Sequence, residues 1–308
     1  MFIDTHAHVN FKAYKEDAGP TIQNALDAGV LVVNVGTHLS TSKEAVETAE
    51  KYENGVYAVV GIHPVHTYSQ NLQEEETQFK TRAEKFDYEV YRKLADNPKV
   101  LGIGECGLDY FRLPTEANIE SGILNIEQIK QIQKEAFIAQ LRLAKELNKT
   151  LVIHSRSSKG TDDACLDILE ILKFEFLPTS SLEKEEESAV SPSLQKRGQG
   201  ELRFVLHSYT GSPEVAKMFV DLGAYLSFNG IITFDKTGNQ EAVLKLVPKD
   251  KIVLETDCPF LTPVPNRGKR NEPLFVKYVA EHVAKVLDLT TAEVEELTTN
   301  NAKRLYNL

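Results

Sequence analysis

Short, almost entirely apolar runs alternate with longer amphipathic stretches along the whole chain, and this alternation is the feature that most limits its fold. The runs are rich in Val, Ile and Leu, which is typical of strands buried on both faces of a parallel sheet. Eight strands are predicted: Phe2–Asp4, Leu31–Val35, Tyr57–Gly61, Val100–Gly104, Leu151–His154, Arg203–His207, Ala224–Phe228 and Ile252–Glu255. The stretches between them predict helices, among them Ser42–Tyr52, Ile126–Asn148, Pro213–Leu222 and Pro273–Leu287, with a last helix after Thr290.

Eight strands separated by helices in 308 residues predict an α/β protein with the (β/α)8, or TIM, barrel fold. The alternative is an open doubly wound sheet, which usually carries a glycine-rich phosphate loop after its first strand. Here His6 and His8 follow the first strand instead, so the barrel is favoured.

We expect residues 1–308 to form a single barrel domain with one insertion. Residues 175–200 are polar, rich in Ser and charge, and interrupted by prolines, which predicts a flexible insertion on the fifth crossover. This insertion is either a lid or partner-docking loop, or simply a solvated excursion of the chain.

The bulk composition excludes several classes of protein. The net charge of −10 argues against broad electrostatic capture of nucleic acid, so a phosphate substrate such as DNA has to be held locally, by metal and a few cations. No apolar run approaches the roughly 20 residues that span a bilayer, and the N-terminus lacks a signal-peptide pattern. The three cysteines are scattered, which indicates a reducing compartment. We expect a cytoplasmic protein (or a nuclear one in a eukaryote), without a membrane association or an obligate protein partner.

Histidines and acids gather where a barrel places its active site, at the C-terminal ends of the strands. Six of the eight histidines lie just after predicted strands one, three, five and six. The chemistry-bearing residues at these ends are His6, His8, His63, His66, Glu105, His154, His207, Glu255 and Asp257. We assign no chemistry to the remaining histidines, His38 and His282. Isolated histidines are often satisfied core residues, but this grouping is typical of a metal site.

The ligand types and their number favour two metal ions. Side chains alternate along a strand, so His6 and His8 point the same way. Neutral imidazoles and carboxylates suit Zn, Mn, Fe or Co, and Mg at the oxygen-rich end. Six of these residues are the candidate ligands: His6, His8, His154, His207, Glu105 and Asp257. Four histidines and two acids exceed what one catalytic ion needs, and Glu105, on strand four, is the natural bridge between two ions. Asp257 either binds one ion and accepts the proton of the attacking water, or caps a helix.

With these residues laid out, the chain resembles the TatD family of metal-dependent deoxyribonucleases, within the amidohydrolase superfamily. The resemblance runs essentially end to end and rests on "DTHAH", "GIHP", "GECGLDY", "VIHSR", "HSYTG", "YLSFNG", "LETDCPFL" and "RGKRNEP". It implies a barrel with a binuclear site that hydrolyses phosphodiester bonds in DNA, often with Mg²⁺. In that site His6 and His8 match the ligands of one metal and Glu105 matches the shared carboxylate. His154 and His207 match the ligands of the second metal, and Asp257 matches the ligand and proton acceptor of strand eight.

The resemblance also implies residues that contact the substrate. His63 matches a histidine that lines the site, and the other positions in or beside the motifs are Asp109, Tyr110, Arg112, Arg156 and Arg267. The arginines suit phosphate oxygens, although each is equally compatible with a surface charge or a structural ion pair. Two features depart from the family pattern: Ser157 stands where many relatives have an acid, and the 175–200 segment is longer than the usual connection.

We therefore expect a metal-dependent phosphodiesterase that acts on DNA as a 3′–5′ exonuclease on single strands. The same bimetal site also suits amide, lactone or ester substrates, and one branch of the resembling family deacylates D-aminoacyl-tRNA. A non-catalytic interaction barrel is the third alternative, supported only by the insertion. A phosphotriesterase-like or dihydroorotase-like site is disfavoured, because Glu105 stands where those enzymes have a carboxylated lysine.

Overall fold

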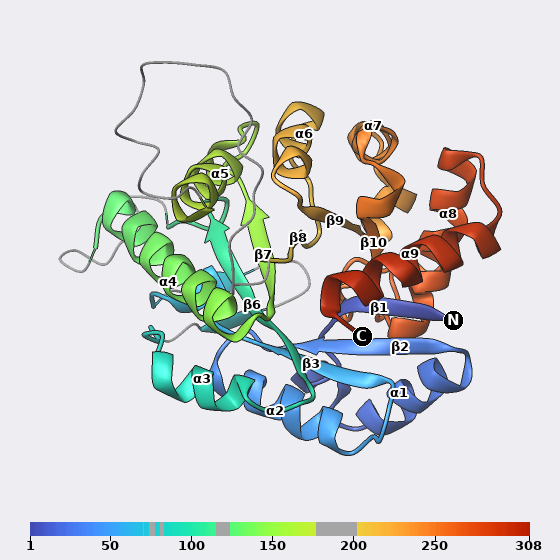
Figure 1. The fold of residues 1–308 in the computed structure, drawn as a ribbon, viewed down its shortest axis with the longest axis horizontal. Coiled ribbons are helices and arrows are strands. Elements are labelled where there is room, and N and C mark those ends of the chain that lie inside the picture. Colours follow the sequence, from blue (N-terminus) through green and yellow to red (C-terminus); the bar gives the residue numbers. More distant parts are fainter. Residues whose placement is uncertain (70, 74–77, 81–82, 115–123, 177–201) are drawn as a thin grey trace, which may run out of the picture.

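A computed structural model describes residues 1–69, 71–73, 78–80, 83–114, 124–176 and 202–308. Within these residues, eight parallel strands lie in the order in which the chain makes them, and helices surround them on the outside (Figure 1). The strands are β1 (Phe2–Ala7), β2 (Val30–Val35), β3 (Val56–Val60), β6 (Val100–Asp109), β7 (Thr150–Arg156), β8 (Phe204–Leu206), β9 (Tyr225–Phe228) and β10 (Ile252–Leu254). The predicted (β/α)8 barrel is confirmed. The predicted insertion at 175–200 lies, except for its first two residues, outside the described residues.

The crossovers are mainly helical. Their helices are α1 (Ala18–Asp27), α2 (Leu39–Glu50), α3 (Tyr88–Ala95), α4 (Ile126–Leu147), α5 (Asp163–Phe176), α6 (Pro213–Asp221), α7 (Asn239–Leu246), α8 (Val276–Leu287) and α9 (Thr291–Tyr306). A small antiparallel pair, β4 (Asn71–Gln73) with β5 (Gln78–Lys80), lies in the crossover between β3 and β6. Among the described residues, no helix combines the length and the apolar composition that crossing a membrane requires.

Several helix ends follow from local sequence. Ser212 caps α6 by accepting the N–H of Val215, and Pro213 occupies the first helical position. Thr290 and Glu293 form the capping box that opens α9. Helix α2 begins at Leu39, three residues before the predicted start.

Backbone hydrogen bonds between the first strand and the segment after the last one close the barrel. The N–H of Asp257 donates to the carbonyl of His6 (2.9 Å), and the N–H of His8 donates to the carbonyl of Cys258 (2.8 Å). The buried Asp4 carboxylate adds to this seam by accepting the N–H and the hydroxyl of Thr256 (2.8 and 2.6 Å). The seam therefore joins the two ends of the sheet directly beside His6 and His8.

The apolar interior has two parts, and one of them decides which end of the barrel is open. The larger part lies between the strands and the outer helices. The smaller part fills the barrel with inward residues such as Ile3, Val152 and Val253, and packs them against Ala302, Leu305 and Tyr306 of α9. The Tyr306 hydroxyl donates to the carbonyl of Thr5 (2.9 Å). Helix α9 thus covers the N-terminal end of the barrel, and the opposite end carries the site.

Candidate metal centre

The predicted ligands come from strands that are distant in sequence but adjacent in the barrel. Strand β1 and its end supply His6 and His8, β6 supplies Glu105, and β7 supplies His154. His207 and Asp257 lie just after β8 and β10. All six are buried or nearly so, and the structure brings all of them together around Glu105.

Two local features of the backbone serve this arrangement. Gly107 lies two residues after Glu105 and opposite His154 in the sheet, with a φ of 137°, and a Cβ atom there would lie 2.0 Å from the carbonyl oxygen of His154. Only glycine therefore allows β6 to run this close to β7. Asp257 has a φ of 56°, in the left-handed region that Asp adopts more readily than most residues. Such strain at a functional side chain is typical of a site that the surrounding fold holds in place.

The first group of candidate ligands consists of His6, His8, Glu105 and Asp257. The Nε2 atoms of His6 and His8 are 3.2 Å apart, and they lie 3.4 and 3.8 Å from Glu105 Oε2. Asp257 Oδ1 is 3.9 Å from His6 Nε2 and 3.3 Å from His8 Nε2. Ligand atoms about 2.1 Å from a tetrahedral ion lie about 3.4 Å from one another. The four side chains therefore fit a metal ion.

The second group is built on the other oxygen of Glu105. Oε1 lies 2.8 Å from His154 Nδ1 and 2.9 Å from His207 Nε2, and these two nitrogens are 3.4 Å apart. Oε1 and Oε2 of one carboxylate thus face different pairs of imidazoles. This is the arrangement that a bridging carboxylate requires.

Neighbouring acceptors fix the orientation of the ligand imidazoles. The ring of His8 has its Nδ1 2.8 Å from the carbonyl of Val35, which leaves Nε2 with a lone pair toward the first group. His154 Nε2 lies 3.2 Å from Asp109 Oδ2, which leaves Nδ1 for the second group. His207 Nδ1 has a longer contact with Glu255 Oε1, at 3.4 Å. These are the carbonyl and carboxylate partners that metal-binding histidines usually have.

The electrostatics keep the bridge ionised and a neighbouring imidazole neutral. Burial alone would raise the pKa of Glu105, but the neighbouring His207, His63 and His154 hold it well below its usual range. Burial, helped by the nearby His154, lowers the pKa of His63 to about 4. Neutral His63 accepts the N–H of Val65 at Nδ1 (3.1 Å), so its Nε2–H points a proton at Glu105 Oε1, 3.3 Å away. His63 therefore positions the bridging carboxylate.

A further set of side chains, His63, Asp109 and His154, is also spaced closely enough to hold an ion. However, the Asp109 oxygens are already engaged by the backbone N–H and the guanidinium of Arg112, at 2.9 and 2.8 Å. We therefore interpret Asp109 as a residue that orients His154 and Arg112 rather than as a ligand.

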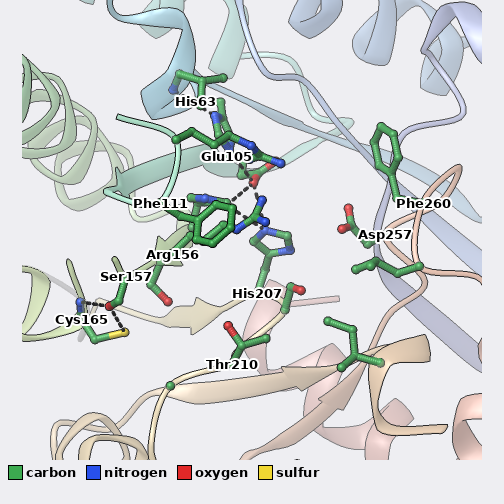
Figure 2. Close-up of a pocket in the computed structure, with 18 of the residues that line it drawn as sticks. His63, Glu105, Phe111, Arg156, Ser157, Cys165, His207, Thr210, Asp257 and Phe260 are labelled. Carbon is green, nitrogen blue, oxygen red and sulfur yellow. Dashed lines mark hydrogen bonds and ion pairs between the residues drawn. The ribbon is translucent and has the colours of Figure 1, made fainter. Parts of the chain in front are cut away.

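A cavity of about 890 Å³ opens above the two ligand groups, and it receives only some of the predicted substrate-contacting residues. His63, Arg112 and Arg156 line it. The guanidinium of Arg156 stacks on the ring of Phe111, 4.1 Å from the ring centre, so that both face the cavity (Figure 2).

The structure does not bring Asp109, Tyr110 or Arg267 into the cavity lining. Asp109 is completely buried beneath it. The hydroxyl of Tyr110 donates to Asp167 on α5 (2.6 Å), outside the barrel. Arg267 donates to the carbonyl of Thr262 (3.1 Å) and stacks on Phe234.

Two positioning groups were not assigned from sequence. Glu255 accepts the N–H of Ser208 (2.8 Å) and lies beside His207. Asn271 donates to the carbonyls of Thr256 and Phe260 (2.9 and 2.6 Å), on both sides of Asp257. Because Glu255 lies at the end of a predicted strand, its place beside the site could have been predicted from the sequence. The loop contacts of Asn271 have no simple pattern in the sequence.

A (β/α)8 barrel with a buried cluster of imidazoles and carboxylates at its open end defines the class of metal-dependent hydrolases. Comparison with known proteins supports the same class. A family model described as "TatD related DNase" matches residues 3–307. The chain is 37% identical, over the full length of both proteins, to the "Uncharacterized metal-dependent hydrolase YabD" of Bacillus subtilis. It is also 30% identical to the "Putative deoxyribonuclease TATDN3" of Mus musculus, over 99% of this chain and 87% of that protein. The chain belongs to the TatD-related DNase family.

A solved structure supports the fold independently. The TatD homologue YJJV from Escherichia coli superimposes with a TM-score of 0.72 at 22% identity, covering 100% of this chain and 98% of that one. The family model and the curated relatives confirm the resemblance stated from the sequence motifs, and the solved structure supports the barrel fold.

Proposed function

We propose that this protein is a metal-dependent phosphodiesterase that hydrolyses DNA, removing nucleotides from single-stranded ends in the 3′–5′ direction. The observation that carries the proposal is the shared carboxylate of Glu105, whose two oxygens face separate pairs of histidines. Two divalent ions, Mg²⁺ or a transition metal such as Mn²⁺ or Zn²⁺, fit this site. His6, His8, Glu105 and Asp257 would hold one, and Glu105, His154 and His207 the other.

Such a pair of ions, when bound, polarises a phosphoryl oxygen and lowers the pKa of the attacking water. The chain supplies the remaining functions. Although burial opposes it, the neighbouring His8, His207 and His6 lower the pKa of Asp257. Asp257 therefore stays a carboxylate, lines the cavity, and serves as the proton acceptor for the attacking water. Arg112 and Arg156 line the same cavity and suit phosphate oxygens through charge-assisted hydrogen bonds.

The family and one relative support DNA as the substrate. The matching family is described as a DNase, and the mouse relative is named as a deoxyribonuclease. The acidic net charge of −10 fits a protein that binds DNA only within this cavity.

The test is hydrolysis of end-labelled single-stranded DNA by the purified protein, with EDTA, with added Mg²⁺ or Mn²⁺, and with Glu105→Ala as the control. We expect metal-dependent cleavage that the variant loses, in a ladder that shortens from the 3′ end. Absence of cleavage by protein with stoichiometrically bound metal would overturn the proposal. A parallel assay on D-aminoacyl-tRNA would then test the same site as a deacylase.

A further inference from the structure

The charged residues of the cavity wall are distributed unevenly, and this unevenness carries an inference about the substrate. The arginines and lysines that line the cavity are Arg112, Arg156 and Lys159, all from the segments at the ends of β6 and β7. The opposite wall is apolar, with Phe11, Ile231, Phe260 and Leu261. Figure 2 shows Phe111 and Arg156 on one side of Glu105, and Phe260 beside Asp257 on the other.

Along β7 and the turn after it, a histidine and two cations follow one another from the floor of the cavity to its rim. His154 is buried at the metal centre, Arg156 is half-buried, and Lys159 is exposed. His154 and Arg156 are two residues apart on one strand, so their side chains leave the same face about 6.6 Å apart. Arg156 therefore lies two residues farther along β7 than His154 of the second ligand group, toward the rim of the cavity. Lys159 lies beyond Arg156.

The turn that carries Lys159 is held in place by its own hydrogen bonds. The N–H and the hydroxyl of Thr161 both donate to the carbonyl of Ser158 (3.0 Å each), and the N–H of Ser158 donates to Asp163 (2.9 Å). Gly160 has a φ of 77°, and a Cβ atom there would meet nothing within 4 Å. The tip of the turn, at Lys159 and Gly160, therefore faces open space at the rim of the cavity.

Among the described residues, the acids near Lys159 do not form an ion pair with it. Asp163 accepts the backbone N–H groups of Ser158 and Ala164, and Asp162 accepts that of Ser212 (3.1 Å). Neither carboxylate lines the cavity. Within the part of the chain that the structure describes, no ion pair joins Lys159 to an acid. The acids that do line the cavity are Glu105 and Asp257, both candidate metal ligands.

We propose that Arg156 and the Ser157–Thr161 turn form a second phosphate-binding subsite, which holds the phosphodiester next to the one being cut. This inference rests on the proposed function. Arg156 and Lys159 supply the charge, and the hydroxyl of Thr210 also lines the cavity. Because the arginines and lysines that line the cavity among the described residues all come from the ends of β6 and β7, the neighbouring phosphate lies on that side of the metal centre. The protein thereby binds a polynucleotide in one direction and prefers it to an isolated phosphodiester.

The test compares two substrates in three proteins. The substrates are a single-stranded oligothymidylate and bis(4-nitrophenyl) phosphate, which has one phosphodiester and no neighbour. The proteins are the wild type, Lys159→Ala, and Lys236→Ala as a control, since Lys236 is exposed and does not line the cavity. We expect Lys159→Ala to lower the ratio of kcat/KM for the oligonucleotide to kcat/KM for the small substrate about five- to tenfold. For Lys159→Ala acting on the oligonucleotide, the slope of log(kcat/KM) against the logarithm of the salt concentration should also become shallower by about 0.7. Lys236→Ala should change neither.

A binding measurement separates failure of this inference from failure of the proposed function. Fluorescence anisotropy of a labelled oligothymidylate in EDTA reports side-chain contacts alone, and we expect the dissociation constant of Lys159→Ala to exceed that of Lys236→Ala. If the wild type cuts neither substrate, the proposed function fails, and the anisotropy result still decides the subsite. Equal binding by the two variants, or an equal loss on both substrates, would overturn the subsite.

Discussion

Asp109 contacts both His154, a candidate metal ligand, and Arg112, an arginine of the cavity. Replacing Asp109 with asparagine tests whether its role is to orient the candidate ligand or to contact the substrate. The carboxylate is completely buried and accepts hydrogen bonds from the backbone and guanidinium of Arg112, at 2.9 and 2.8 Å. His154 Nε2 lies 3.2 Å from the same oxygen that the guanidinium contacts. Burial alone would raise the pKa of Asp109, but the hydrogen bond from His154 and the charge of Arg112 lower it, so the group is a carboxylate.

In Asp109→Asn the amide has one oxygen where the carboxylate has two, and its NH2 group meets either the guanidinium or His154. The lost hydrogen bond to a charged group is worth about 1.5–3 kcal/mol. Partners of metal-binding histidines typically contribute a factor of about 10–100 in metal affinity. We therefore expect the metal dissociation constant of the variant to rise about 10- to 100-fold, with activity partly restored by excess metal.

The assay is competition for Zn²⁺ or Mn²⁺ against a chromophoric chelator, and it does not depend on turnover. Asp167→Asn is the matched control, because Asp167 is also paired (with Tyr110 and with Lys134 at 2.8 Å) but contacts no candidate ligand. An unchanged metal dissociation constant in Asp109→Asn, together with a raised KM, would refute the reasoning and return Asp109 to the substrate-contacting role that the sequence motif implied.

Three further outcomes follow from the same structure. Phe137→Ala, which removes a completely buried ring on α4, should lower the free energy of unfolding by about 3–5 kcal/mol, measured by urea denaturation. Removing metal with EDTA should lower Tm and adding it back should restore Tm in a concentration-dependent way, since metal binds only the folded arrangement; a Tm independent of metal would contradict the site. The hydrogen bond from Arg270 lowers the pKa of Asp17, so this pair contributes stability above the ordinary carboxyl pKa and loses it as pH falls. In Arg270→Gln, an NMR titration should show the pKa of Asp17 rising toward its usual value.

The order of the strands and the clustering of the candidate ligands were predictable because both depend on local pattern. Buried strands of a parallel barrel are apolar runs, and barrel chemistry lies at their ends, so His6, His8, Glu105 and Asp257 could be located before any coordinates. The end of β6 was less predictable. The strand was predicted to stop at Gly104 but continues to Asp109, because polar and glycine residues there still pair with β7.

The residues that orient the ligands could be predicted only in part. Glu105, Gly107 and Asp109 alternate toward the barrel interior, which leaves Tyr110 on the helix-facing side of β6, where its hydroxyl reaches Asp167. The sequence motif alone does not show that Asp109 and Tyr110 lie on different faces of β6. The alternation of side chains along a strand does show it. By contrast, the contacts of Arg267 with Thr262 and Phe234 depend on how one irregular loop packs, and no periodicity predicts them.

The barrel seam has a consequence for the order in which the protein matures. His6 and His8 leave the ribosome first, whereas Asp257, the segment that bonds to their backbone, and helix α9 leave it nearly last. The first ligand group therefore cannot assemble on a nascent or truncated chain, however well its earlier strands have folded. Metal capture by this group therefore requires both the completed chain and the closed barrel, so an unfinished chain lacks the hydrolase's candidate site.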